Sequence, residues 1–394
     1  MNKTVNCLID VMAASLGSRP LNSDFEGVNF SALLKLANLH RIDIPMYYAL
    51  KDVAGVPQEI SAELKRRQDM NALKSAVVSA ETEYLNGVFD ANDIPYMLLK
   101  GSVIRELYPS PDMRTSCDVD YLIKSEDSDK IEKLMTAAGY DFTNNDKGVD
   151  AYKKPPFVSI EIHRELMGGH EELDCLHNLW ENAVDLEKTT LGKKMSQEDF
   201  YVYTIVHIAK HLTYGGSGIR PLMDMYLYLK NYRDSLNWEY IYSTLATVGL
   251  ETLAKELDLL QSHWFCGGEK SDVTDELSKY IVESGIFGTV ENSEAQREVY
   301  RRAGAEISKK QPFFKVVFLS YKNMTLRYTS LKTPILLPIY WCVRIIDVLL
   351  HKREKIAPLL GNVTEISESK VQKTEKLFTR LGIINKSEAT KNGN

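Results

Sequence analysis

Two carboxylates stand two residues apart at the start of a short apolar run. Asp118 and Asp120 flank Val119, in a stretch whose composition predicts a strand from Val119 to Ile123. Because strand side chains alternate between the faces of a sheet, residues two apart point to the same face. The aspartates are therefore expected side by side, an arrangement that can hold a hard divalent cation, although an Asp-x-Asp pair also occurs without a metal.

A later strand prediction, Val158 to His163, adds a third acid. The same alternation places Glu161 and His163 on one face and turns Ile160 and Ile162 to the other. If the strands are neighbours, three carboxylates converge and repel one another, and Mg²⁺ or Mn²⁺ is the usual remedy. His163 then either supports the metal ligands or has a purely structural role.

A candidate phosphate-binding turn precedes the aspartates. Lys100, Gly101 and Ser102 follow the predicted strand Ile94 to Leu99 and open a short helix, so backbone N–H groups and the serine hydroxyl could face a polyphosphate. Arg114 could add a two-pronged phosphate contact. The sequence contains no Walker A and no dinucleotide-binding glycine motif. Each of these motifs alone is weak evidence for a nucleotide site. The order of turn, paired aspartates and later glutamate along the chain is the more specific signal.

Four polar residues further on are candidates for a cleft. His207 and His211 are four apart and share a helix face, but Ile208 stands where a zinc-protease helix needs glutamate. We expect the two histidines either to line a cleft or to make a contact between helices. Zinc binding is the less favoured alternative, because the glutamate of the zinc-protease motif is missing. Arg220 reaches a phosphate or Asp224, or is a surface residue at a helix start.

The elements expected to position these residues indicate an α+β fold, in which a small mixed-sheet module is embedded between helical regions. Helical periodicity dominates on both sides of the module, and a short final stretch is polar. No internal repeat is present. The predicted division is an N-terminal helical region 1–90, an α/β core 91–166, a helical domain 167–300, a basic helical segment 301–366 and a polar tail 367–394 whose end, 387–394, is expected to be disordered.

The amino-acid composition excludes several classes of protein. The 394 residues are 44% hydrophobic and 26% charged, as in a globular protein of two or three domains and unlike a disordered or disulfide-rich chain. Five scattered cysteines without a C-x-x-C pair fit a reducing, cytoplasmic setting. No run of apolar residues is long enough to span a bilayer; the nearest, 333–350, is interrupted by two prolines and two charges.

The charge is unevenly distributed. Residues 301–355 contain 12 Lys or Arg and 3 Asp or Glu, a net +9, so that the rest of a chain with net charge −6 carries −15. The basic segment either flanks an apolar scaffold or attaches peripherally to an anionic membrane. Because most of the chain is acidic, a nucleic-acid partner is less favoured than other partners.

Three stretches in order carry a family resemblance. They are Leu98-Leu99-Lys100-Gly101-Ser102, Arg114-Thr115-Ser116-Cys117-Asp118-Val119-Asp120-Tyr121-Leu122-Ile123, and Ile160-Glu161-Ile162-His163. Together they resemble the uncharacterised nucleotidyltransferase family of the DNA polymerase beta superfold. The resemblance covers 94–164 and extends more weakly to the helical region with His207 and to 333–344. The interval from Gly101 to Asp118 is longer than in minimal members, which leaves the nucleotide pose open.

The resemblance implies transfer of a nucleoside monophosphate from an NTP to a hydroxyl of a small-molecule or protein acceptor, with pyrophosphate leaving. Asp118 and Asp120 would bridge two Mg²⁺ or Mn²⁺ ions, and Glu161 would ligate one of them and accept the hydroxyl proton. The phosphate-binding residues would be Lys100, Gly101, Ser102 and Arg114.

Two other function classes remain open. A non-catalytic protein on the same fold would sense a nucleotide or bind a partner, as antitoxin-like proteins do, although three clustered acids argue for turnover. A phosphotransferase acting on an aminoglycoside-like molecule would suit the acidic body. Fold alone does not choose among these, and neither the base of the NTP nor the oligomeric state is predicted.

Overall fold

The computed structural model describes most of the chain. The described residues are 2–22, 25–115, 118–146, 149–166, 175–286, 288–302, 333–341, 343 and 367–384. The expected disordered end, 387–394, and most of the basic segment 301–355 lie outside them.

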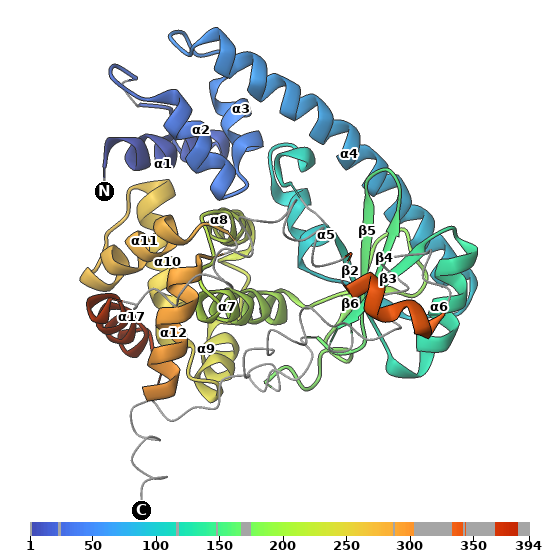
Figure 1. The fold of residues 1–394 in the computed structure, drawn as a ribbon. Coiled ribbons are helices and arrows are strands. Elements are labelled where there is room, and N and C mark those ends of the chain that lie inside the picture. The colour runs from blue at the N-terminus through green and yellow to red at the C-terminus, as the bar shows by residue number, and fades with distance from the viewer. Residues whose placement is uncertain are drawn as a thin grey trace, which may run out of the picture.

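The N-terminal region is helical, as its periodicity predicts. Its longest helix, α4, has 34 residues and runs from the N-terminal helices to the sheet (Figure 1). Leu64, near its start, is buried in the large core of the helices, whereas Leu85 and Phe89, near its end, are buried in a second core against the sheet. One helix therefore connects the two cores. The helices are α1 (Lys3–Ser15), α2 (Phe30–Leu39), α3 (Asp43–Leu50) and α4 (Gln58–Ala91).

The α/β module is built on a seven-stranded mixed sheet in the order β3-β4-β5-β2-β1-β7-β6. Two neighbouring pairs, β2 with β5 and β1 with β7, are parallel, and the other pairs are antiparallel. The strands are β1 (Tyr96–Leu98), β2 (Val119–Ile123), β3 (Asp141–Asp146), β4 (Val149–Lys154), β5 (Val158–His163), β6 (Val184–Asp185) and β7 (Gly192–Lys194). The helices of the module are α5 (Lys100–Ile104), α6 (Ser128–Ala137) and the single 3-10 turns η1 (Arg105–Leu107), η2 (Pro111–Met113) and η3 (Ser125–Asp127).

The strands β6 and β7 correct the expectation that helical structure resumes directly after Leu166. Among the described residues, the first helix after the module begins at Gln197, and β7 extends the sheet beside β1. These strands are short and polar, so they lack the apolar alternation that signals a strand. They are held by backbone pairing and by Asp90 at the end of α4, whose carboxylate accepts the N–H groups of Thr190 and Leu191 at 2.9 and 2.8 Å.

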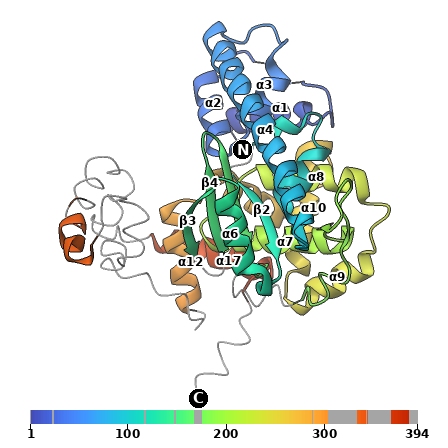
Figure 2. The ribbon, with the colours of Figure 1, turned by 90° about the vertical axis from the view of Figure 1, so that its right-hand side faces the viewer.

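The two faces of the sheet have different surroundings. Val119, Tyr121 and Ile123 of β2 belong to the core formed with α4 and α6, which cover the outer side of the sheet (Figures 1 and 2). The Tyr121 ring lies 5.4 Å from that of Phe89, an edge-to-face contact of about 0.5–1.5 kcal/mol, and its hydroxyl donates to Asn86 at 3.0 Å. This anchoring fixes the strand register, so Asp120 must face the helical domain on the other side.

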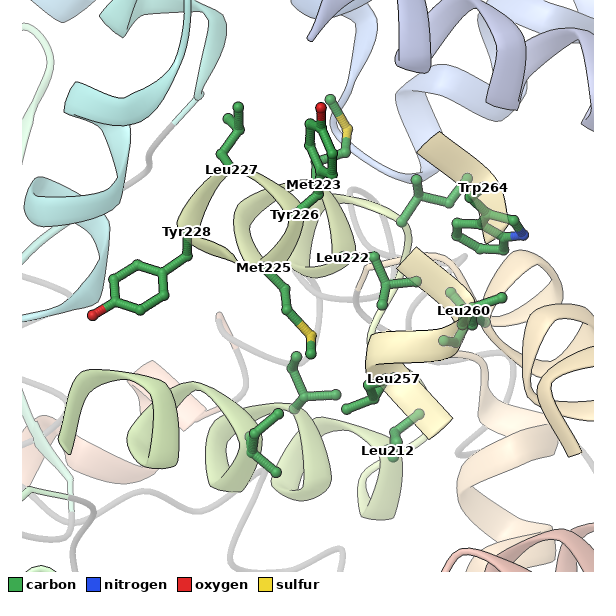
Figure 3. Packing of buried hydrophobic residues seen from close by; sticks show 14 of the residues in the cluster. Leu212, Leu222, Met223, Met225, Tyr226, Leu227, Tyr228, Leu257, Leu260 and Trp264 are labelled. Carbon is green, nitrogen blue, oxygen red and sulfur yellow. The ribbon is translucent and has the colours of Figure 1, made fainter. Parts of the chain in front are cut away.

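The helical domain is organised around α8. Figure 3 shows Met225 extending from α8 toward α7 and Leu222 toward α10, among the buried residues of the large core. The glycine loop before α8 is required sterically, because Gly216 has φ +147° and an added Cβ would lie 2.0 Å from the Cβ of Ser284. The described helices of the domain and of the C-terminal stretch that follows it are α7 (Gln197–Thr213), α8 (Arg220–Tyr232), α9 (Trp238–Thr247), α10 (Glu251–Cys266), α11 (Asp272–Ser284), α12 (Val290–Arg302), the 3-10 turn η5 (Pro334–Leu336) and α17 (Glu368–Arg380).

The helix α17 occupies part of the stretch expected to be a polar tail. Its polar residues alternate with a buried stripe that includes Leu377 and Phe378, and the Phe378 ring meets Tyr280 of α11 at 5.7 Å. Within the described part of the chain, no helix has the length and apolar character needed to cross a membrane.

The stripe on α17 predicts a stability contribution from the C-terminal stretch. Phe378→Ala should lower the free energy of unfolding by about 3–5 kcal/mol, because the ring is fully buried. Lys373→Ala, on the exposed side of the same helix, should change it by less than about 0.5 kcal/mol. Chemical denaturation measures both, and equal effects of the two changes would show that α17 does not pack as described.

Candidate functional site

The parallel pairing of β2 with β5 brings the predicted acids together. Asp120 stands opposite Glu161 in the register, and His163 follows two residues later on the same face. The ligand atoms of Asp120, Glu161 and His163 lie within 4.8 Å of one another, and all three side chains are half-buried. Asp120, Glu161 and His163 thus converge as strand alternation and neighbouring strands imply, and His163 offers a donor atom in the cluster itself.

His163 lies between two carboxylates, and its imidazole ring is protonated at neutral pH. Its Nε2 atom lies 3.6 Å from Oδ1 of Asp120 and 3.7 Å from Oε2 of Glu161, which is too long for a hydrogen bond. Burial lowers the pKa of His163, but the two carboxylates outweigh it and raise this pKa to about 9. Among the described residues neither ring nitrogen has a hydrogen-bond partner, although both are buried.

These observations fit a cation. Two carboxylates and an unpartnered imidazole nitrogen form a donor set of the type that divalent metals use, and a metal would satisfy the nitrogen that hydrogen bonding leaves unsatisfied. A metal that binds Nε2 must displace the proton there, since a metal-bound imidazole is neutral.

Asp118 belongs to the same electrostatic cluster. Burial, and then the negative charges of Asp120 and Glu161, raise the pKa of Asp118 to about 7, while Arg220 and Arg114 lower it in part. The three donors that converge in the structure do not include Asp118. Its predicted role as a bridging ligand stays a prediction.

The turn after β1 lies beside this cluster. The N–H of Leu99 donates to the carbonyl of Asp120 at 3.0 Å, which ties the turn to β2. Lys100 is buried, and burial lowers its pKa to about 8, although Asp224 raises it in part. The amine therefore still carries a charge at neutral pH. Gly101 and Ser102 lie in the first turn of α5, where their predicted phosphate contacts remain predictions.

The helix α7 supplies the histidine pair. The rings of His207 and His211 are 4.5 Å apart, and Nδ1 of His207 lies 3.5 Å from Nζ of Lys100. Burial and the positive charge of Lys100 hold the pKa of His207 well below its usual value, and the same causes lower that of His211 to about 4. Both are therefore neutral at pH 7. His207 contacts the lysine, and among the described residues neither histidine belongs to a cluster with metal-ligand spacing.

Arg114 and Asp224 form a buried ion pair. Nε and Nη2 of Arg114 donate to the two carboxylate oxygens of Asp224, each at 2.9 Å. The N–H groups predicted to hold phosphate are thus bonded to Asp224, and a direct phosphate contact by Arg114 stays a prediction. Arg220 donates to the carbonyl of Thr115 at 2.8 Å.

Tyr108 is a site residue that the sequence did not indicate. Its hydroxyl donates to Oδ1 of Asp224 at 2.8 Å, and both side chains are buried. The two residues are 116 positions apart, and Tyr108 lies in a proline-containing loop without periodicity. No local signal could have found this contact.

Comparison with known proteins now adds to this geometry. Residues 26–265, more than half of the chain, match the family described as uncharacterised nucleotidyltransferase. The chain belongs to this family. The family match includes both the acidic cluster of the sheet and helices α7 and α8 of the helical domain. No curated protein matches.

A solved structure is also similar. It is described as an antigenic nucleotidyltransferase-like protein from Paracoccidioides brasiliensis, with 16% sequence identity and a TM-score of 0.31. The similarity covers 50% of this chain and 94% of that protein.

The charge states predict how metal affinity depends on pH. At pH 6 the pKa values of about 7 for Asp118 and about 9 for His163 leave protons on both groups, and a bound cation must displace them. Mn²⁺ should therefore bind at least about tenfold more tightly at pH 8 than at pH 6. Isothermal titration at the two pH values measures this. The control is Asp141→Asn, on the exposed part of β3, which should show the same pH dependence as the wild type. A wild-type affinity that does not change with pH would contradict the assigned charge states.

Proposed function

We propose that this family member is a metal-dependent nucleotidyltransferase. It moves a nucleoside monophosphate from an NTP to a hydroxyl of a small-molecule or protein acceptor and releases pyrophosphate. The observation that carries the proposal is the convergence of Asp120, Glu161 and His163, with Asp118 beside them, on the sheet face that looks toward the helical domain. Family membership supplies the reaction class.

The cation would be Mg²⁺ or Mn²⁺, and two ions would need all four groups. Asp118, Asp120 and Glu161 offer oxygen ligands, and His163 offers a nitrogen that favours Mn²⁺ over Mg²⁺. When bound, such a cation neutralises phosphate charge and lowers the pKa of a hydroxyl.

The side chains of the chain have separate tasks in this proposal. Glu161, half-exposed at the edge of the cluster, accepts the proton of the acceptor hydroxyl on a carboxylate oxygen. The ammonium of Lys100 holds a phosphate by charge, and neutral His207 accepts a hydrogen bond from it and so directs it. The N–H groups and hydroxyl of Gly101 and Ser102 would bind phosphate oxygens.

The net charge of the chain indicates which kind of acceptor would bind. Outside 301–355 the chain carries −15, which disfavours a polyanionic nucleic acid and suits a cationic small molecule or a basic protein segment.

One observation favours the second candidate, a nucleotide-sensing or antitoxin-like partner-binding protein. With a pKa of about 9, His163 is an imidazolium at neutral pH and compensates part of the charge of Asp120 and Glu161 by itself. A cluster balanced in this way is compatible with a protein that binds a nucleotide without turnover. Incubation with labelled NTPs and candidate acceptors separates the two, because only the enzyme releases pyrophosphate.

The proposed enzyme depends on its carboxylates. The double change Asp118→Asn and Asp120→Asn should leave the fold intact and lower metal-dependent NMP transfer by roughly 100-fold or more, since ligand charge is lost. Titration with Mn²⁺ and a non-hydrolysable NTP measures the binding step. Asp141→Asn should retain wild-type binding and activity. Wild-type protein that binds no NTP, or a double variant that binds it as the wild type does, would overturn the proposal.

We also propose that the protein is cytoplasmic and contacts an anionic membrane peripherally. The five cysteines are scattered along the sequence without a C-x-x-C pair, in keeping with a reducing compartment. In the basic segment, Ile335 and Ile339 are four residues apart and 87% and 59% exposed, and this short stretch lies apart from the helical domain in Figure 2. Apolar side chains within a +9 segment have the composition of an interfacial anchor.

Vesicle binding tests this attachment. Wild-type protein should float with vesicles containing phosphatidylserine and not with purely zwitterionic vesicles, and Ile335→Glu with Ile339→Glu should reduce flotation at least about fivefold. Met70→Glu with Leu73→Glu, at exposed apolar positions of α4, is the matched control. Failure of the wild type to bind anionic vesicles would remove the proposal.

A further inference from the structure

The chain segment that leads into the acidic cluster is held by α8 of the helical domain. Arg114 precedes Asp118 by four residues, and its side chain is only 6% exposed. The partner, Asp224, lies in the second turn of α8 and has a side chain that is 2% exposed. The guanidinium and carboxylate meet in a two-pronged contact with both distances at 2.9 Å. Such a planar contact fixes orientation as well as separation.

The carboxylate of Asp224 is fully engaged. It also accepts the hydroxyl of Tyr108 at 2.8 Å, so three donors from the α/β module converge on it. Burial raises the pKa of Asp224, but Arg114 outweighs it and keeps this pKa below its usual value. Asp224 is therefore a fixed negative charge at the boundary between the module and α8.

Two further hydrogen bonds connect this pair to the candidate site. Nη1 of Arg114 donates to the carbonyl of Gly101 at 3.3 Å, in the turn after β1. Arg220, at the start of α8, donates to the carbonyl of Thr115 at 2.8 Å. Helix α8 thus holds both the turn proposed to bind phosphate and the backbone that approaches Asp118.

The energetics favour a positional role over a stabilising one. Removing two charges from water costs several kcal/mol per ion, so a buried ion pair adds little net stability, and well-packed apolar residues often replace it without loss. Removing one partner alone is costly, because the other charge is left buried. The ion pair fixes the orientation of the Arg114 guanidinium, and this group in turn donates to the Gly101 carbonyl. Apolar side chains at the two positions would not fix this orientation.

We infer that Asp224 is a positioning residue of the nucleotidyl-transfer site. Acting through Arg114 and Tyr108, it sets the separation between the Gly101 turn and Asp118, which is the span that a metal-bound triphosphate must bridge. The helical domain is thereby a component of the site. This inference rests on the proposed function, because it assigns the position of groups that would bind the nucleotide.

The test replaces the whole pair. The variant Arg114→Met with Asp224→Leu removes both charges of the pair, so that neither partner is left buried without the other, and its melting temperature should stay within about 5 °C of the wild type. Its Kd and KM for Mn²⁺ with NTP should rise at least tenfold. The matched control is Arg233→Met with Asp258→Leu, which removes an ion pair between the C-cap residue of α8 and α10, nine residues after Asp224, and should leave both constants unchanged.

A second variant covers the case in which the double change does not fold. Tyr108→Phe removes one hydrogen bond to Asp224 without leaving a charge unpaired, and it should raise the KM for NTP about threefold or more while the melting curve shows a folded protein. Wild-type constants in a folded double variant or in Tyr108→Phe would overturn the positioning role. Wild-type protein that binds no nucleotide would instead overturn the proposed function, and the inference with it.

Discussion

The parallel pairing of β2 with β5 is the constraint on which the site depends. Its register sets Asp120 beside Glu161, and the alternation of both strands turns these acids away from the apolar core. Like charges at this distance repel. Burial, together with the charges of Asp120 and Glu161, raises the pKa of Asp118, and the same two carboxylates raise the pKa of His163, so that a proton on either group reduces the repulsion. A divalent cation is a third way and would replace both protons.

The sheet alone does not complete the site. Among the described residues, α4 and α6 cover the outer face of the sheet, which leaves for a nucleotide the face that looks toward α7 and α8. These helices contribute charged and polar groups to the turn and to the segment before β2, among them His207 and Asp224. Packing of α8 by apolar contacts on several sides keeps these groups in place (Figure 3). The geometry of the candidate site is therefore a property of two packed units.

Local patterns in the sequence predicted the parts that depend on short-range geometry. Alternation in Val158–His163 was sufficient to assign Glu161 and His163 to one face, because strand period is a property of the backbone. It could not predict the pairing of Arg114 with Asp224, which are 110 residues apart. The strands β6 and β7 and the helix α17 were missed for a related reason: their stability comes from distant partners and their sequences are polar.

The presence of a cation between β2 and β5 is the central claim, and anomalous scattering tests it most directly. Crystals grown with Mn²⁺ and a non-hydrolysable NTP should show a manganese peak bounded by Asp120, Glu161 and His163, with the phosphates approaching it from the side of Lys100. Crystals that contain ordered nucleotide but no manganese peak at these residues would contradict a metal-dependent transferase.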